Sequence, residues 1–220
     1  MLEAARGHAV FDGWSEATFR AACRDVGIAP ELGRALFPRG AVDLAVADHR
    51  AGDRAMAAAL GREDPGALRF RDRVARAIRL RLELADRERA RRAAALFALP
   101  QHAATGASLL WGTADAIWRA LGDRSEDVNW YTKRATLSAV YAATLLYWLG
   151  DESEGQAASW DFLDRRIGDV MRFESAKARA REHPLLGRLL AVPGRLLRDV
   201  RPPADHGADL PGRISEPEAP

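Results

Sequence analysis

Residues 127–149 read DVNWYTKRATLSAVYAATLLYWL, and this stretch decides the fold. It has no Pro or Gly, and its Ala and Leu content favours a helix. From Ala135 onward the helix is apolar nearly all round, which is typical of a buried central element. The apolar part contains Ser138 and Thr144 and falls short of the roughly 18–20 residues that cross a bilayer. We therefore expect the central helix of a soluble or peripheral intracellular protein.

Helix-favouring sequence continues on both sides of this stretch, with Pro and Gly at the breaks. The chain of 220 residues is 48% hydrophobic, enough for a core of its own. Alternating β-branched patterns are absent, so we predict an all-α bundle. Its long helices are expected at 41–60, 66–85, 87–99, 103–121, 127–149 and 155–182.

The first 40 residues predict three short helices in a helix-turn-helix arrangement. Ser15 is expected to cap the second helix, Gly27 to close it and Pro30 to open the third. The expected domains are this block at 1–40, a helical bundle at 41–182, an amphipathic segment at 183–201 and a disordered Pro-rich tail at 202–220. Five Arg balance five acidic residues in the block, which makes DNA an improbable partner.

Motifs for catalysis are missing from the sequence. It has no Gly-x-Gly-x-x-Gly loop, no His-Glu-x-x-His and no Glu-x-x-His, and Cys23 is the single cysteine. The five histidines are scattered and are interpreted as surface or capping residues: His8, His49, His102, His183 and His206. We expect no enzyme activity, no metal and no cofactor, with Cys23 in the core.

Two aromatic features indicate binding. Adjacent helical residues point about 100° apart, so Trp130 and Tyr131 cannot both face one core stripe. They are either helix anchors or, with Asp127 and Asn129, a partner-binding patch. A second set comprises ordinary core residues or the wall of a cavity for a lipid tail: Trp111, Trp118, Leu137, Tyr141, Leu145 and Trp148.

The third feature is the segment 184–198, PLLGRLLAVPGRLLR. On a helical wheel its leucines lie opposite its arginines, which is typical of a helix at a membrane surface. A helix packed on its own domain has the same pattern, and Pro193 interrupts it. The candidate membrane-binding residues are Leu185, Leu186, Arg188, Leu189, Leu190, Arg195, Leu196, Leu197 and Arg198.

The long motifs NWYTKR at 129–134 and FLDRRI at 162–167 resemble the coenzyme Q (ubiquinone) biosynthesis accessory protein family. The resemblance extends through RALFPRGAVDLA at 34–45, RFRDRVARAIRLRLEL at 69–84 and LFALPQHAATGASLLWGTADAIWRALGD at 96–123, and covers most of residues 10–175.

That resemblance implies a TetR-regulator-like fold, a homodimer and binding of an isoprenoid quinone or phospholipid. It further implies presentation of quinone intermediates to a di-iron demethoxyubiquinone hydroxylase, through a patch that maps onto Asp127, Asn129, Trp130 and Tyr131. The segment 185–198 matches the family's membrane-binding helix. Because no transit peptide precedes the domain, we expect a bacterial member, cytoplasmic and peripheral on the inner membrane. The alternative is a TetR-type DNA-binding regulator with a hydrophobic ligand pocket.

Overall fold

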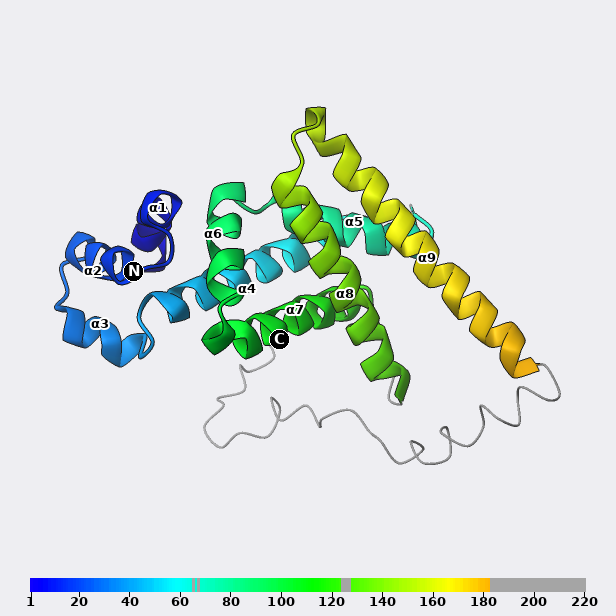
Figure 1. Cartoon of the computed structure of the whole chain (residues 1–220), viewed down its shortest axis with the longest axis horizontal. Coiled ribbons are helices and arrows are strands. Elements are labelled where there is room, and N and C mark those ends of the chain that lie inside the picture. Colours follow the sequence, from blue (N-terminus) through cyan, green and yellow to red (C-terminus); the bar gives the residue numbers. More distant parts are fainter. Residues whose placement is uncertain (65, 67, 124–127, 183–220) are drawn as a thin grey trace, which may run out of the picture.

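The computed structural model describes residues 1–64, 66, 68–123 and 128–182, and over these residues the chain is helical without strands (Figure 1). The predicted all-α fold is therefore confirmed. The helices are α1 (Leu2–Asp12), α2 (Glu16–Asp25), α3 (Pro30–Leu36), α4 (Ala41–Leu60), α5 (Phe70–Glu83), α6 (Arg87–Phe97), α7 (Ala103–Ala120), α8 (Val128–Gly150) and α9 (Ala157–Glu182).

Helices α1 to α3 form a small head at one end of the molecule (Figure 1). The Ser15 hydroxyl accepts the Thr18 backbone N–H at 3.3 Å, so the predicted N-cap of α2 is present. Phe19 and Cys23 are buried against Leu44 of α4 in a core of the head's own. Helix α4 supplies part of that core and then continues into the main bundle, so it connects the two parts of the protein.

The main bundle packs α4, α5, α7, α8 and α9 around a second core. Leu137, Tyr141 and Trp148 of α8 are buried in it. The burial of this predicted central helix is incomplete, since Leu146 is 66% and Tyr147 41% exposed. Helices α6, α7 and α9 cover the other faces of α8, and this apolar face stays at the surface.

Asp151 fixes the turn between α8 and α9. Its carboxylate accepts the backbone N–H of Ser153 at 2.8 Å, the backbone N–H of Ser159 at 2.8 Å and the Ser159 hydroxyl at 2.5 Å. These hydrogen bonds hold the pKa of Asp151 well below its usual range. The carboxylate thus accepts a backbone N–H from the first turn of α9. This helix begins at Ala157 rather than at the predicted residue 155.

None of the helices that the structure describes is long and apolar enough to span a bilayer. The candidate membrane-binding segment 185–198 lies outside the described residues. Asp127 of the predicted patch lies outside them as well.

Candidate functional site

Three aromatic rings meet where the start of α8 lies against α7. We call Trp111, Trp130 and Tyr131 the aromatic surface. The centroid of the Trp130 ring lies 4.8 Å from that of Tyr131 and 5.9 Å from that of Trp111. All three side chains are half-buried, and Asn129 beside them is exposed. Neither Trp130 nor Tyr131 is fully buried, in line with the expectation that they cannot both face one core stripe, and their role in partner binding stays a prediction.

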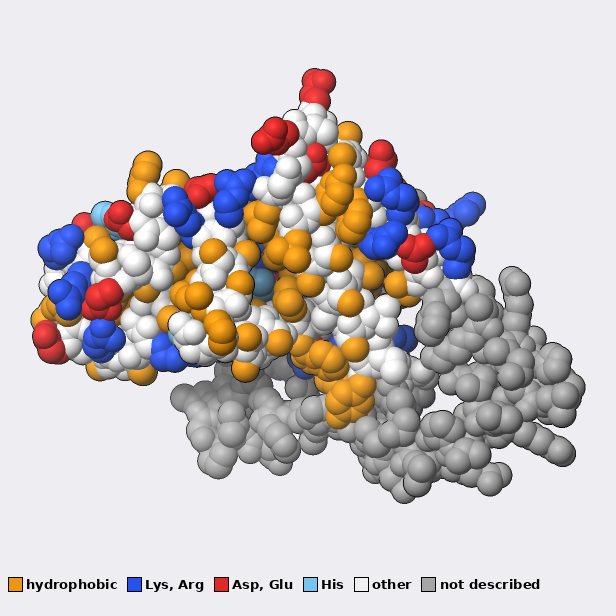
Figure 2. Space-filling model, viewed as in Figure 1, with side chains coloured by type: hydrophobic (Ala, Val, Ile, Leu, Met, Phe, Trp, Pro, Cys, Tyr) orange, Lys and Arg blue, Asp and Glu red, His pale blue; other side chains and the backbone are white. Residues whose placement is uncertain are grey.

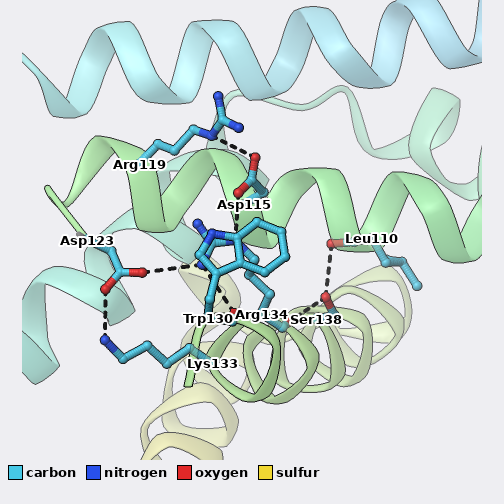
Figure 3. Close-up of polar contacts among 8 residues, drawn as sticks. All are labelled: Leu110, Asp115, Arg119, Asp123, Trp130, Lys133, Arg134 and Ser138. Carbon is cyan, nitrogen blue, oxygen red and sulfur yellow. Dashed lines mark hydrogen bonds and ion pairs between the residues drawn. The ribbon is translucent and has the colours of Figure 1, made fainter. Parts of the chain in front are cut away.

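The buried Arg134 side chain packs against the Trp130 ring of this surface (Figure 3). The Arg134 side chain is only 2% exposed, and its Nε donates to Asp115 of α7 at 2.6 Å. A second nitrogen lies 3.3 Å from Asp123 and 3.2 Å from the Trp130 carbonyl oxygen. Two carboxylates compensate the buried charge, which makes its burial tolerable.

Sequence reasoning missed Arg134 and its partners Asp115 and Asp123. The available signal was the spacing of four residues between Trp130 and Arg134, which places both on one face of a helix. Lys133 is also tied to this region, because its Nζ lies 2.8 Å from Asp123 and above the Trp118 ring.

The six predicted lipid-contact residues lie in three different parts of the structure: the core, the aromatic surface and the wall of a cavity. Trp118, Leu137 and Trp148 are core residues. Trp111 belongs to the aromatic surface. Tyr141 and Leu145 line a cavity, a space that could hold a ligand.

That cavity has a volume of about 590 Å³, within the usual range of about 300–1,000 Å³ for small-molecule sites. Figure 2 shows a hollow on this face, surrounded by hydrophobic side chains. Short side chains of α4, α6, α7 and α8 leave the space open. Its alanines are Ala45, Ala51, Ala55, Ala85, Ala90, Ala93, Ala94, Ala98, Ala103, Ala107 and Ala142.

One side of the cavity is polar and lies next to the head. Arg6 of α1 donates to Asp48 of α4 at 2.6 Å, and Arg89 of α6 lies 3.8 Å from the same carboxylate. The Arg89 Nε is buried without a hydrogen-bond partner. The cavity therefore combines a long apolar lining with a polar side, the arrangement that suits an amphiphile.

Deeper on this side, His49 belongs to a buried network. Its Nε2 lies 2.8 Å from the Thr113 hydroxyl, which lies 2.9 Å from Asp53. Arg81 pairs with Asp53 at 2.7 Å and donates to the His49 carbonyl at 3.0 Å. Burial, together with the nearby Arg81, lowers the pKa of His49 to about 4. The interpretation of His49 as a surface or capping residue is wrong, because α7 covers this face of α4.

Comparison with known proteins gives a family match for part of the chain. Residues 103–174, which contain α7, α8 and most of α9, match the COQ9 family. The chain carries a COQ9 region. It is 41% identical over 93 residues to the rat mitochondrial ubiquinone biosynthesis protein COQ9, covering 42% of this chain and 30% of that protein.

A longer match extends beyond the COQ9 region. The chain is 29% identical over 180 residues to the COQ9 protein of Drosophila melanogaster, covering 79% of this chain and 55% of that protein. The chain thus spans about a third to a half of the curated relatives that it matches. These relatives are ubiquinone biosynthesis proteins by name.

The fold itself is shared with a solved structure. A TetR transcriptional regulator from Nitrosomonas europaea superimposes with a TM-score of 0.60, over 76% of this chain and 93% of that one. Sequence identity is 18%, so this likeness shows the fold alone. The predicted TetR-like fold is confirmed.

The predicted localisation is contradicted. Matching proteins from rat, Drosophila melanogaster and Homo sapiens are named as mitochondrial proteins, which conflicts with a bacterial cytoplasm. The expectation rests on where the sequence begins, and the first residue of a sequence does not determine the cellular compartment of a protein.

Proposed function

We propose that this protein is a non-catalytic accessory factor of ubiquinone biosynthesis that binds an isoprenoid quinone intermediate or a phospholipid. The observation that carries the proposal is the alanine-lined cavity in a chain with a COQ9 region. Tyr141 and Leu145 line it together with apolar side chains of α6 and α7. Such a lining removes an apolar chain from water, a gain of about 0.8 kcal/mol for each buried CH₂.

The aromatic surface is proposed to present this lipid to the di-iron hydroxylase of the pathway. Half-buried Trp and Tyr side chains beside the exposed Asn129 form the kind of surface that carries much of the binding energy in protein interfaces. Because Arg134 holds Trp130 against α7, the surface is preorganised. Preorganisation lowers the entropic cost of association.

Two further parts of the proposal concern assembly. The exposed apolar residues Leu146 and Tyr147 on α8 offer a face for a second copy of the chain, and we propose a homodimer there. The segment 185–198, outside the described residues, is proposed from its sequence to attach the protein to a membrane surface.

Native mass spectrometry with lipid extraction tests the central proposal. The full chain is expected to carry an isoprenoid quinone or phospholipid, and its mass gives the oligomeric state. Ala107→Phe, which fills the cavity, is expected to lose the lipid, whereas Ala104→Phe on the exposed part of α7 keeps it. A wild-type protein that carries no lipid and takes up none from quinone-containing vesicles would contradict the proposal.

A DNA-binding regulator is the second candidate, favoured by the shared fold. The head offers few groups for phosphate, because Arg34 pairs with Glu16 at 2.7 Å and Arg39 with Asp43 at 2.6 Å. On α3, Leu32 and Leu36 are exposed instead. Sequence-dependent retardation of duplex DNA at moderate salt would establish this candidate in place of the accessory factor.

A further inference from the structure

The polar side of the cavity contains Arg89 of α6, a lining residue whose side chain is 22% exposed. Among the described residues, no atom accepts a hydrogen bond from its guanidinium group. Asp48 is its ion-pair partner, but Asp48 Oδ2 lies 3.8 Å from the Arg89 Nε, which is too far for a hydrogen bond. A guanidinium largely removed from water without hydrogen bonds costs free energy, and such groups are rare in proteins.

The other two lining arginines have close partners. Each donates to a carboxylate at hydrogen-bond distance, Arg6 to Asp48 at 2.6 Å and Arg81 to Asp53 at 2.7 Å. The Asp48 carboxylate is thus already held by Arg6, and Arg89 retains only the longer contact with it. Of the three lining arginines, Arg89 therefore has the least compensated charge.

The main chain of Arg89 is held in place at the start of α6. Its N–H donates to Asp86 Oδ1 at 2.9 Å, and its carbonyl oxygen accepts from Trp14 Nε1 at 3.4 Å. The side chain therefore starts from a fixed point beside the head, to which Trp14 belongs. A planar guanidinium fork fits two oxygens of a carboxylate or a phosphate, and a fixed position lowers the entropic cost of binding them.

We propose that the cavity takes an amphiphile with an anionic head, a carboxylate or a phosphate, which pairs with the Arg89 guanidinium while its carbon chain lies along the alanines. This inference rests on the proposed function, because it requires that the cavity holds an amphiphile. It names the chemical class of the head group and the side chain that selects it. The anion supplies the hydrogen-bond acceptors that the described residues do not offer Arg89. Repulsion from Asp48 is reduced, because Arg6 compensates its charge.

Probes that share a ten-carbon chain test the head group without any mutation. Decanoate and decyl phosphate carry the anion, methyl decanoate has acceptor oxygens without the charge, and 1-decanol has a neutral hydroxyl. In calorimetry with the full-length protein at neutral pH, at least one anion is expected to bind about ten- to a hundredfold more tightly than both neutral probes, the value of one charge-assisted hydrogen bond. The tighter anion identifies the source of the head group.

The outcomes separate this inference from the proposed function. Neutral probes that bind as tightly as both anions, or more tightly, would overturn the inference and leave the proposed function standing. Binding of none of the probes would overturn the inference and remove the cavity from the proposed function as well.

Arg89→Met assigns the preference to one side chain, with Arg92→Met as the matched control. Arg92 lies on the exposed side of the same helix and pairs with Glu88 at 3.0 Å. In Arg89→Met the tighter anion is expected to fall to the affinity of 1-decanol, whereas Arg92→Met keeps the preference. Arg89→Lys should keep part of it, because it retains the charge without the planar fork. A preference retained in full in Arg89→Met would refute the assignment.

NMR of the wild-type protein decides even if Arg89→Met melts early. The ¹⁵Nε–H signal of Arg89 is expected to shift when the tighter anion is added and to stay in place with 1-decanol. An Arg89 signal that does not respond while the anion binds would refute the pairing.

Discussion

The guanidinium carbon of Arg134 lies 3.9 Å from the centroid of the Trp130 ring, one turn away on α8. The same guanidinium faces Asp115 of α7, so the position of a half-exposed aromatic ring depends on an arginine that solvent scarcely reaches. A cation at this distance attracts the ring, more strongly where water is excluded. Trp130 is thereby coupled to the packing of α7 against α8.

Replacing this arginine is expected to cost much of the protein's stability. Arg134→Met removes the cation that pairs with Asp115 and Asp123. Breaking a buried ion pair lowers the free energy of unfolding by about 3–5 kcal/mol. Urea unfolding followed by circular dichroism measures the loss. Arg119→Met is the matched control, because Arg119 also pairs with Asp115 but is 60% exposed, and it is expected to cost less than about 1 kcal/mol. Equal losses in the two variants would refute the supporting role of Arg134.

Truncating the aromatic surface tests its role in recognition. Trp130→Ala and Tyr131→Ala are each expected to weaken binding to the hydroxylase about thirtyfold, a hot-spot loss of about 2 kcal/mol. Phe11→Ala is the control, since Phe11 of α1 is a highly exposed aromatic residue in the head. Affinities come from surface plasmon resonance and stabilities from thermal melts. If Trp130→Ala and Tyr131→Ala melt early and bind only in proportion to their folded fraction, these residues are helix anchors.

Most of the fold could be predicted because its signals are local. Ser15 caps α2, Pro30 opens α3, and the breaks at Gly61 and Pro100 lie where the helices end. Helix α5 begins at Phe70, four residues after the predicted start at residue 66, because a Pro-Gly pair does not fix the first residue of a helix.

The cavity could not be predicted, because its lining comes from helices that are far apart in the sequence. Alanine favours a helix wherever it stands, and its pattern does not show which alanines surround an empty space. The His49 network likewise joins α4, α5 and α7 through Asp53, Arg81 and Thr113. Only the packing of these helices shows that a histidine taken for a surface residue is buried.

Gly52 is expected to be required for the Arg81–Asp53 ion pair. A Cβ atom at Gly52 would lie 2.7 Å from the Arg81 guanidinium carbon, and the buried ion pair leaves that group little room to move. Gly52→Ala should therefore destabilise the protein by about 1–3 kcal/mol through overpacking. Gly112→Ala in α7 meets no atom within 4 Å and should stabilise it by about 0.5–1 kcal/mol. Unfolding in urea measures both, and a stabilising Gly52→Ala would contradict the close approach.

Membrane attachment is expected to depend on residues 184–201. Removing them leaves every described residue in place, so thermal unfolding should be unchanged. Flotation with vesicles that contain anionic lipid should be lost, since each buried leucine contributes about 1.5–3 kcal/mol and each arginine at the surface about 1 kcal/mol. Leu189→Glu should lose most of the flotation, and Asp199→Asn should keep it. A truncated protein that floats as well as the full chain would show that attachment lies elsewhere.

Protonation of His49 is expected to make the protein less stable in mild acid. Its pKa is about 4 in the folded protein, against an ordinary value of 6.5, because of burial and the adjacent Arg81 on α5. Asp53 and Asp48 of α4 act in the opposite direction but do not outweigh these effects. Between pH 6.5 and 4 the unfolded chain therefore binds a proton at His49 that the folded protein does not. As the pH decreases from 6.5 to 4, the free energy of unfolding therefore decreases by about 3 kcal/mol because of this residue.

Urea unfolding at intervals from pH 7 to 4 measures this dependence of the free energy of unfolding on pH. His49→Gln should flatten it, His8→Gln should leave it steep, and equal slopes in the wild-type protein and His49→Gln would show that His49 is not held neutral by the fold.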